Sequence, residues 1–239
     1  TYMTEQKIDV LAFGAHPDDI ELGAGGTLAG LSRQGKSIGL VDLTAGEMGT
    51  RGTVEIRAEE AQKAATILGA SFRLNLAWPD GFFEHNKEHL TEIVGLLRRY
   101  RPDLVILNAP NDRHPDHGRA SKIVSDAVFY AGLRKFETEG LEAWCSRAQY
   151  HYVQFYSLEP SILVDVSQDF ATKIDSIRAH ASQFYDPNSK EPETVIASKS
   201  FFDSIEGRAL DLGKLIGVRY AEAFVCPRTP GVADLTQLL

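Results

Sequence analysis

Short apolar runs alternate with amphipathic segments along the first half of the chain. The apolar runs, typical of buried β-strands, occupy residues 8–14, 37–44, 72–76 and 103–107. Helical spacing of apolar side chains follows each run, most clearly at Leu90, Ile93, Val94 and Leu97. Repeated strand–helix units favour a parallel sheet joined by right-handed crossovers. The pattern therefore predicts an α/β, Rossmann-like fold, with a mostly parallel sheet and helices on both faces.

The second half of the chain repeats this order less regularly. Strands are predicted over residues 150–156 and 162–166, and helices from about residue 170 and over much of 195–216. The stretch Asp186-Pro187-Asn188-Ser189-Lys190-Glu191-Pro192 is the strongest loop signal. Because no repeat and no long linker divides the chain, residues 1–239 are predicted to form a single domain.

Composition narrows the classes of partner. The net charge of -8 argues against nucleic acid, because phosphate binding needs a basic surface. Two cysteines are too few for a disulfide framework, which favours a reducing cytoplasm. No apolar stretch approaches the roughly 18 residues of a transmembrane helix, and residues 1–7 lack the apolar core of a signal peptide. We therefore predict a cytoplasmic protein with no membrane partner.

Two polar clusters follow predicted strands. Ala15-His16-Pro17-Asp18-Asp19 comes directly after the run 8–14, and Asp112-Arg113-His114-Pro115-Asp116-His117 follows the run 103–107. Open α/β sheets bind ligands at the carboxyl ends of their strands. Two such ends rich in histidine and aspartate predict a divalent metal held between them.

The residue types in these clusters fit a catalytic metal site. Zinc in such a site takes three histidine or carboxylate ligands and leaves one position for water, and His16, Asp19 and His117 supply such a set. Asp18, beside these ligands, is placed to take a proton from that water. The sequence thus predicts a hydrolase with Zn²⁺, or Fe²⁺ in the cell, because histidine–carboxylate sites accept both metals.

Two further residues of the second cluster are predicted to assist. His114, as an imidazolium, is placed to stabilise an oxyanion or to protonate a leaving amine. Asp116 is placed to orient one of the histidines. Turn chemistry is the alternative, because proline and aspartate are common in turns and aspartate caps helices. The occurrence of both clusters at strand ends favours the metal site.

The two clusters together resemble the LmbE/PIG-L family of zinc-dependent N-acetylglucosamine deacetylases. The resemblance covers most of the chain and implies a Rossmann-like fold and a homo-oligomer. It also implies zinc ligands at His16, Asp19 and His117, a general base at Asp18, and an electrostatic or acid partner at His114. These are the roles that the local chemistry indicates.

Less specific similarities indicate one branch of the family. Residues 42–47, 52–57, 74–76 and 112–117 resemble the branch that deacetylates N-acetylglucosaminyl-L-malate in bacillithiol biosynthesis. Malate carries two carboxylates, for which arginine offers a bidentate partner. Candidate substrate-binding residues are Arg57, which the resemblance also places at the substrate, Arg113 and Glu47. The alternatives are an ion pair of Arg57 with a helix glutamate and a surface loop around Glu47.

Other functions remain open at this point. The same core would serve a deacetylase acting on a chitobiose-type, mycothiol-type or antibiotic-precursor substrate, which differs in the rim of the site. A non-catalytic, metal-dependent sugar-binding module is a second alternative. A nucleotide-binding protein is a third, but the glycines at 23–26 do not form the dinucleotide fingerprint. We therefore expect a small amino-sugar substrate, with its aglycone undetermined.

Overall fold

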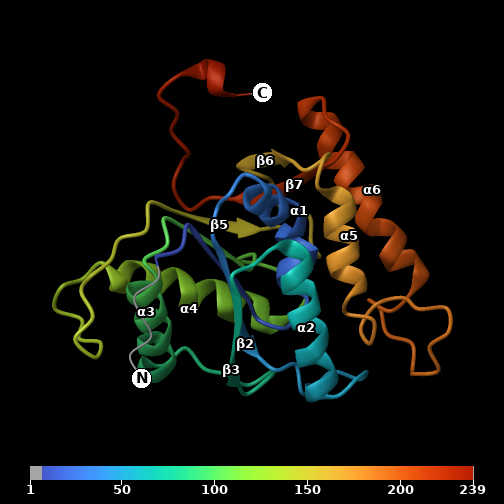
Figure 1. Ribbon diagram of the computed structural model, residues 1–239, viewed down its shortest axis with the longest axis horizontal. Helices are drawn as coiled ribbons and strands as arrows, with labels where there is room; N and C mark the ends of the chain where they lie inside the picture. The colour runs from blue at the N-terminus through green and yellow to red at the C-terminus, as the bar shows by residue number, and fades with distance from the viewer. Residues whose placement is uncertain (1–6, 239) are drawn as a thin grey trace.

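The computed structural model describes residues 7–238 and contains a seven-stranded sheet in the order β3-β2-β1-β4-β5-β7-β6 (Figure 1). Parallel pairing joins β1 (Val10–Gly14), β2 (Ile38–Thr44), β3 (Phe72–Trp78), β4 (Leu104–Leu107) and β5 (Ala148–Tyr152). The strand β7 (Ala221–Val225) runs antiparallel to both β5 and β6 (Ile162–Asp165). The predicted α/β class with a mostly parallel sheet is confirmed.

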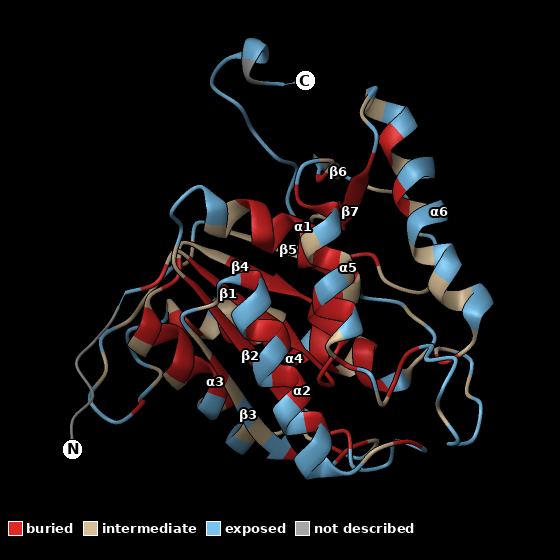
Figure 2. Ribbon diagram, turned by 45° about the vertical axis from the view of Figure 1, so that its right-hand side comes forward, coloured by how far each residue is buried: buried red, intermediate tan, exposed pale blue. Residues whose placement is uncertain are grey.

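Helices cover both faces of this sheet, where buried residues lie between helix and strand (Figure 2). Their bounds are α1 (Asp19–Arg33), α2 (Val54–Leu68), α3 (Lys87–Tyr100), α4 (Pro115–Ala131), α5 (Phe170–Arg178), α6 (Lys199–Ile216) and the short η1 (Leu235–Gln237). One core cluster joins α3 and α4 to the sheet, and a second joins α1 and α2 to its other face. Within residues 7–238, none of these helices has the length and hydrophobicity needed to span a membrane.

Local signals set several helix ends. The Thr53 hydroxyl accepts a hydrogen bond from the Ile56 N–H at the start of α2, and Gly69 at φ 71° ends that helix. At the start of α4, the His114 side chain accepts from the Asp116 N–H, and Pro115 occupies the first turn. The second loop cluster is therefore also the N-terminus of a helix.

Two strands differ from the prediction. The strand predicted over 150–156 ends at Tyr152, because the Asp112 carboxylate accepts hydrogen bonds from the Phe155 and Tyr156 N–H groups. The strand β7 was not predicted, because Glu222 interrupts its apolar run. The Glu222 carboxylate is buried against the ammonium group of Lys173 and the N–H groups of α1.

Replacing Gly23 with alanine is expected to destabilise the fold by at least about 1–3 kcal/mol through overpacking. An added Cβ would lie 2.1 Å from Cδ2 of Tyr152, whose buried hydroxyl donates to the Phe13 carbonyl. The matched control is Gly207→Ala in α6, where a Cβ meets no atom within 4 Å and is expected to stabilise by roughly 0.5–1 kcal/mol. Urea unfolding of both variants checks the pair; equal midpoints would show that α1 does not need this glycine.

Candidate active site

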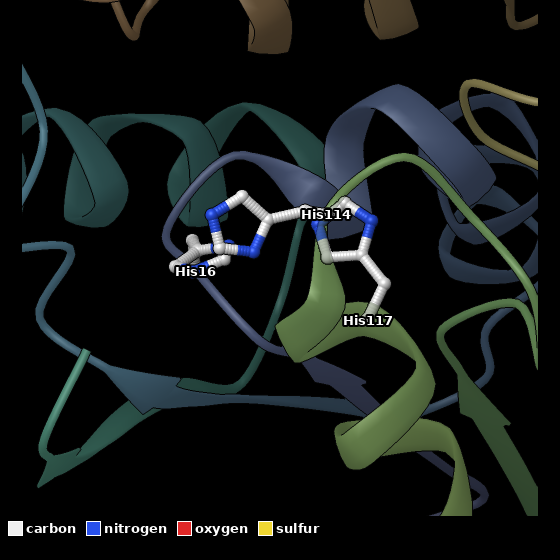
Figure 3. Close-up of side chains that lie close together, drawn as sticks. All are labelled: His16, His114 and His117. Atoms are coloured by element: carbon white, nitrogen blue, oxygen red, sulfur yellow. The ribbon is translucent and has the colours of Figure 1, made fainter. Parts of the chain in front are cut away.

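The loops that follow β1 and β4 meet at the carboxyl edge of the sheet. These strands are parallel neighbours, so the chain leaves both at the same edge. His16 comes from the first loop, and His114 and His117 come from the start of α4 (Figure 3). The ring centroid of His16 lies 4.6 Å from that of His114 and 5.6 Å from that of His117. The structure therefore brings the two sequence clusters together.

The carboxylate of Asp19 lies between two imidazoles. Its Oδ2 is 3.4 Å from Nδ1 of His16, and its Oδ1 is 3.1 Å from Nε2 of His117. Ligand atoms of a tetrahedral ion with bonds of ~2.0–2.1 Å lie about 3.3 Å apart, so each of these two contacts, made by a different oxygen of Asp19, has a length expected between two ligands of one ion. Burial alone would raise the pKa of Asp19, but His117 and His16 hold it well below its usual range. This carboxylate thus needs positive charge, which a metal would supply in place of protons.

Two groups of three residues have donor atoms within 4.8 Å of one another in the described part of the chain, and neither group includes Asp19. One contains the three histidines, with His114 in place of Asp19. The other joins Nε2 of His16 to Oδ1 of Asp80 at 3.0 Å and to Oδ2 of Asp116 at 3.2 Å. These two carboxylates also accept the backbone N–H groups of Met48 and Gly81. They therefore contact Nε2 of the His16 ring, whereas Asp19 contacts Nδ1.

Further polar groups hold the other members of the cluster. Oδ2 of Asp112 lies 2.8 Å from Nδ1 of His117. The side-chain amides of Asn108 and Gln154 donate to the Asp19 carboxylate at 3.1 and 2.6 Å. Such partners orient metal ligands and fix histidine tautomers.

Asp116, which the sequence predicts to orient one of the histidines, lies beside His16. The sequence predicts no role for Asp80, Asp112 or Gln154. The turn Trp78-Pro79-Asp80-Gly81 follows a predicted strand, so the strand-end rule could have identified Asp80. Gln154 carries no comparable signal, because the sequence pattern places it inside a predicted strand.

Asp18 has an unusual backbone and a buried carboxyl group. Its φ is 132°, a region that a non-glycine residue occupies at a cost of order 1–3 kcal/mol. Burial raises the pKa of Asp18 to about 6, although the charge of Arg57 acts in the opposite direction. The side chain lines a cavity with His16 and Asp19 but makes no ion pair with His16 or His117 among the described residues. This position fits the predicted base.

The guanidinium of Arg57 binds the loops around Asp18. Its Nη1 donates to the Gly46 carbonyl at 2.8 Å, and its Nη2 donates to the Pro17 carbonyl at 3.0 Å and to Asp18 at 3.3 Å. These three bonds leave two of the five guanidinium N–H donors for the substrate role predicted for Arg57: one on Nη1, and Nε–H, which is buried and has no partner in the described residues. The bonds it does make fix the strained Asp18 loop.

The surroundings of His114 favour its neutral form. Burial lowers the pKa of His114, and the charges on His16 and His117 lower it further. Its Nδ1 accepts the Asp116 N–H, which leaves the proton on Nε2. The geometry therefore supports a neutral hydrogen-bond donor rather than the imidazolium expected from the sequence.

The two remaining predicted substrate residues lie in different places. Glu47 is exposed, does not line the cavity, and accepts the Asp80 N–H at 2.7 Å. Arg113 lines the cavity, with its Cζ 4.8 Å from the ring centroid of Phe155. The structure therefore keeps Arg113 as a candidate for substrate contact and gives Glu47 a part in holding the Asp80 turn.

The cluster opens into a cavity of about 430 Å³. Polar residues of the two loops line one part of it, and α6 lines another with Phe201, Ile205, Arg208 and Leu212. This volume lies within the range of small-molecule sites. The cavity can therefore hold a substrate of the size of a substituted sugar beside Asp18 and His114.

Replacing Asp80 with asparagine is expected to weaken metal binding by about 10–100-fold, as loss of an outer partner of a metal-binding histidine does. The amide keeps the size of the side chain but removes the charge that faces Nε2 of His16. Competition against a fluorescent chelator measures the dissociation constant. Asp126→Asn, at a surface contact with His85, is the control. Equal affinities in the two variants would contradict the role of Asp80.

Comparisons with known proteins agree with this geometry. Residues 11–128 match the family PIG-L, described as GlcNAc-PI de-N-acetylase. The chain is 34% identical to a diacetylchitobiose deacetylase of Thermococcus kodakarensis over 89% of this chain and 80% of that protein. It is 29% identical to a probable N-acetyl-alpha-D-glucosaminyl L-malate deacetylase 2 of Bacillus anthracis, over 73% of this chain and 81% of that protein.

A solved structure has the same fold. The conserved protein TT1542 from Thermus thermophilus superposes with a TM-score of 0.86 at 37% identity, covering 95% of this chain and 98% of that one. The match extends beyond residues 11–128 to the second half of the chain. The similarity thus includes α6 and β7 as well as the two loops.

Proposed function

Because this chain belongs to the PIG-L family of GlcNAc-PI de-N-acetylases, we propose that it is a metal-dependent hydrolase that removes acetate from an N-acetylglucosamine-type substrate. The observation that carries the proposal is the buried carboxylate of Asp19 between His16 and His117, with Asp18 beside it in the cavity. A binding module has no need of a strained, buried carboxyl group next to its ligands.

His16, Asp19 and His117 are the residues that would hold the metal. A divalent ion bound there would act as a Lewis acid and would lower the pKa of a water molecule. We propose Zn²⁺, with Fe²⁺ as the alternative, because nitrogen and carboxylate donors accept both ions. Asp80, Asp116 and Asp112 would keep the two imidazoles oriented.

Of the remaining residues, Asp18 carries out the proton transfers and His114 stabilises the negative charge. The Asp18 carboxylate takes a proton from the attacking water and returns it to the sugar nitrogen as the C–N bond breaks. Nε2–H of His114 donates to the acetyl oxygen while it carries negative charge. Arg57 keeps the Asp18 carboxylate in place through bonds to Pro17 and Gly46. The products are acetate and a free amine.

For the substrate, we propose N-acetylglucosaminyl-L-malate, which bacillithiol biosynthesis deacetylates. The malate deacetylase relative and the resemblance at residues 112–117 support this substrate. The diacetylchitobiose deacetylase relative supports a neutral chitobiose-type substrate equally well. The same core also fits a mycothiol-type or antibiotic-precursor substrate.

Primary-amine release by zinc-loaded protein tests both the proposed deacetylase activity and the proposed substrate. The substrates are N-acetylglucosaminyl-L-malate, N,N'-diacetylchitobiose and free N-acetylglucosamine. Preference for the malate glycoside would support the full proposal. Preference for chitobiose would keep the deacetylase and replace the substrate. Absence of amine from all three, at confirmed metal content, would favour the binding module.

A further inference from the structure

The segment after β5 is tied directly to the candidate metal ligands. Gln154 donates to Oδ1 of Asp19 at 2.6 Å. Asp112, which contacts His117, also accepts the N–H groups of Phe155 at 3.3 Å and Tyr156 at 2.9 Å. A ligand that rests on Phe155 is therefore held at a fixed place relative to the reacting centre.

Two arginines from distant parts of the chain meet at Phe155. Arg113 places its Cζ 4.8 Å from the ring centroid, and Nη2 of Arg208, from α6, donates to the Phe155 carbonyl. Both arginines line the cavity. Within residues 7–238, neither has a carboxylate oxygen within 4.0 Å, whereas Arg57, the other arginine in the cavity lining, is paired with Asp18. The Phe155 subsite, formed by Phe155, Arg113 and Arg208, thus carries positive charge without a bound counter-charge.

The residues around Arg208 leave its guanidinium able to bind an anionic ligand. On the same helix, the cavity lining next to Arg208 contains the apolar residues Ile205, Ala209 and Leu212 and one polar residue, Ser204. Burial lowers the pKa of the Arg208 guanidinium, and Asp112 only partly opposes this effect. Since the Phe155 carbonyl takes one of five guanidinium N–H donors, the others remain for an anion.

The chemistry of the substrate indicates which group this subsite meets. In an N-acetylglucosamine glycoside, the aglycone is on C1 and the acetamido group is on the adjacent C2. The aglycone therefore lies next to the reacting amide, and the contacts of Gln154 with Asp19 and of Asp112 with the Phe155 N–H hold Phe155 beside the same centre. We propose that Arg208, together with Arg113, binds a carboxylate of the aglycone and selects anionic over neutral glycosides. This inference rests on the proposed deacetylase function and adds the residue that sets its substrate class.

The test compares Arg208→Met with Arg208→Lys on the zinc-loaded protein. For N-acetylglucosaminyl-L-malate, kcat/KM is expected to fall about 10–100-fold in Arg208→Met, mainly through KM, as loss of a charged hydrogen bond does. Turnover of the neutral N,N'-diacetylchitobiose is expected to stay within about twofold. The lysine variant should recover part of the loss, because it keeps the charge without the bidentate fork.

The control is Arg219→Met, which removes a similar cation from an aromatic ring 5.0 Å away outside the cavity. Equal losses on the anionic and the neutral substrate in Arg208→Met would overturn the inference, as would a wild-type enzyme that does not prefer the malate glycoside. If no substrate releases amine, the proposed function fails. Calorimetric binding of glucosaminyl-L-malate then tests Arg208 alone, and unchanged affinity in Arg208→Met overturns its role.

Discussion

Replacing Asp18 with asparagine is expected to lower turnover by about 10²–10⁴-fold while the protein still binds its metal. The amide has the size of the carboxylate and can accept the hydrogen bond from Arg57, so the strained loop keeps its main contact. It cannot take a proton from water. Because Asp19, and not Asp18, lies between His16 and His117, the donor atoms for the metal are unchanged.

Amine release at matched metal content measures this effect. His16→Ala is the companion variant, because it removes a ligand and is expected to lose the metal and the activity together. Near-normal turnover in Asp18→Asn would remove Asp18 from the role of base. Loss of metal in Asp18→Asn would instead make it part of the metal site.

Replacing Arg73 with methionine is expected to lower the free energy of unfolding by about 3–5 kcal/mol. Its guanidinium joins Asp42 of β2, at 2.7 and 2.8 Å, to Glu21 of α1, and all three side chains are at most 1% exposed. Methionine would leave two buried carboxylates without this partner. Urea unfolding at pH 7 gives the value. Arg33→Met, which breaks a pair to Asp169 in which Arg33 is 47% exposed, is the control, and its unfolding midpoint is expected to change much less, because water screens the pair.

The loss in Arg73→Met should shrink as the pH falls. Burial raises the pKa of Glu21, but Arg73 and His180 bring it down to about 2, below its ordinary 4.5. The stability that Glu21 contributes is therefore lost as the pH falls from about 4.5 towards 2. Without Arg73, burial raises the pKa of both carboxyls, so they take up protons and cease to be unpaired charges. A constant difference between pH 7 and pH 4 would show that the carboxylates are compensated elsewhere.

Much of the fold and part of the site were accessible from sequence. The strand–helix order was predictable because each apolar run is a local pattern whose burial does not depend on its partner. The ends of α2 follow from Thr53 and Gly69, which act within a few residues. The convergence of His16 and His117 follows from one rule, since parallel neighbouring strands release their loops at one edge. The strand β7 was missed because Glu222 is buried only through a distant partner, Lys173.

Other features were decided by tertiary structure. No local pattern relates Asp80 to His16, Arg57 to the carbonyls around Asp18, or Arg208 to Phe155, because each pair is far apart in sequence. The lowering of the pKa of His114 also depends on burial and on the charges of His16 and His117. The sequence by itself determined which chemical groups reach the edge of the sheet, because strand ends and turns are set locally. Which atoms face one another, and with what charge, was decided only by packing, because hydrogen bonds and desolvation depend on the exact positions of side chains distant in the chain.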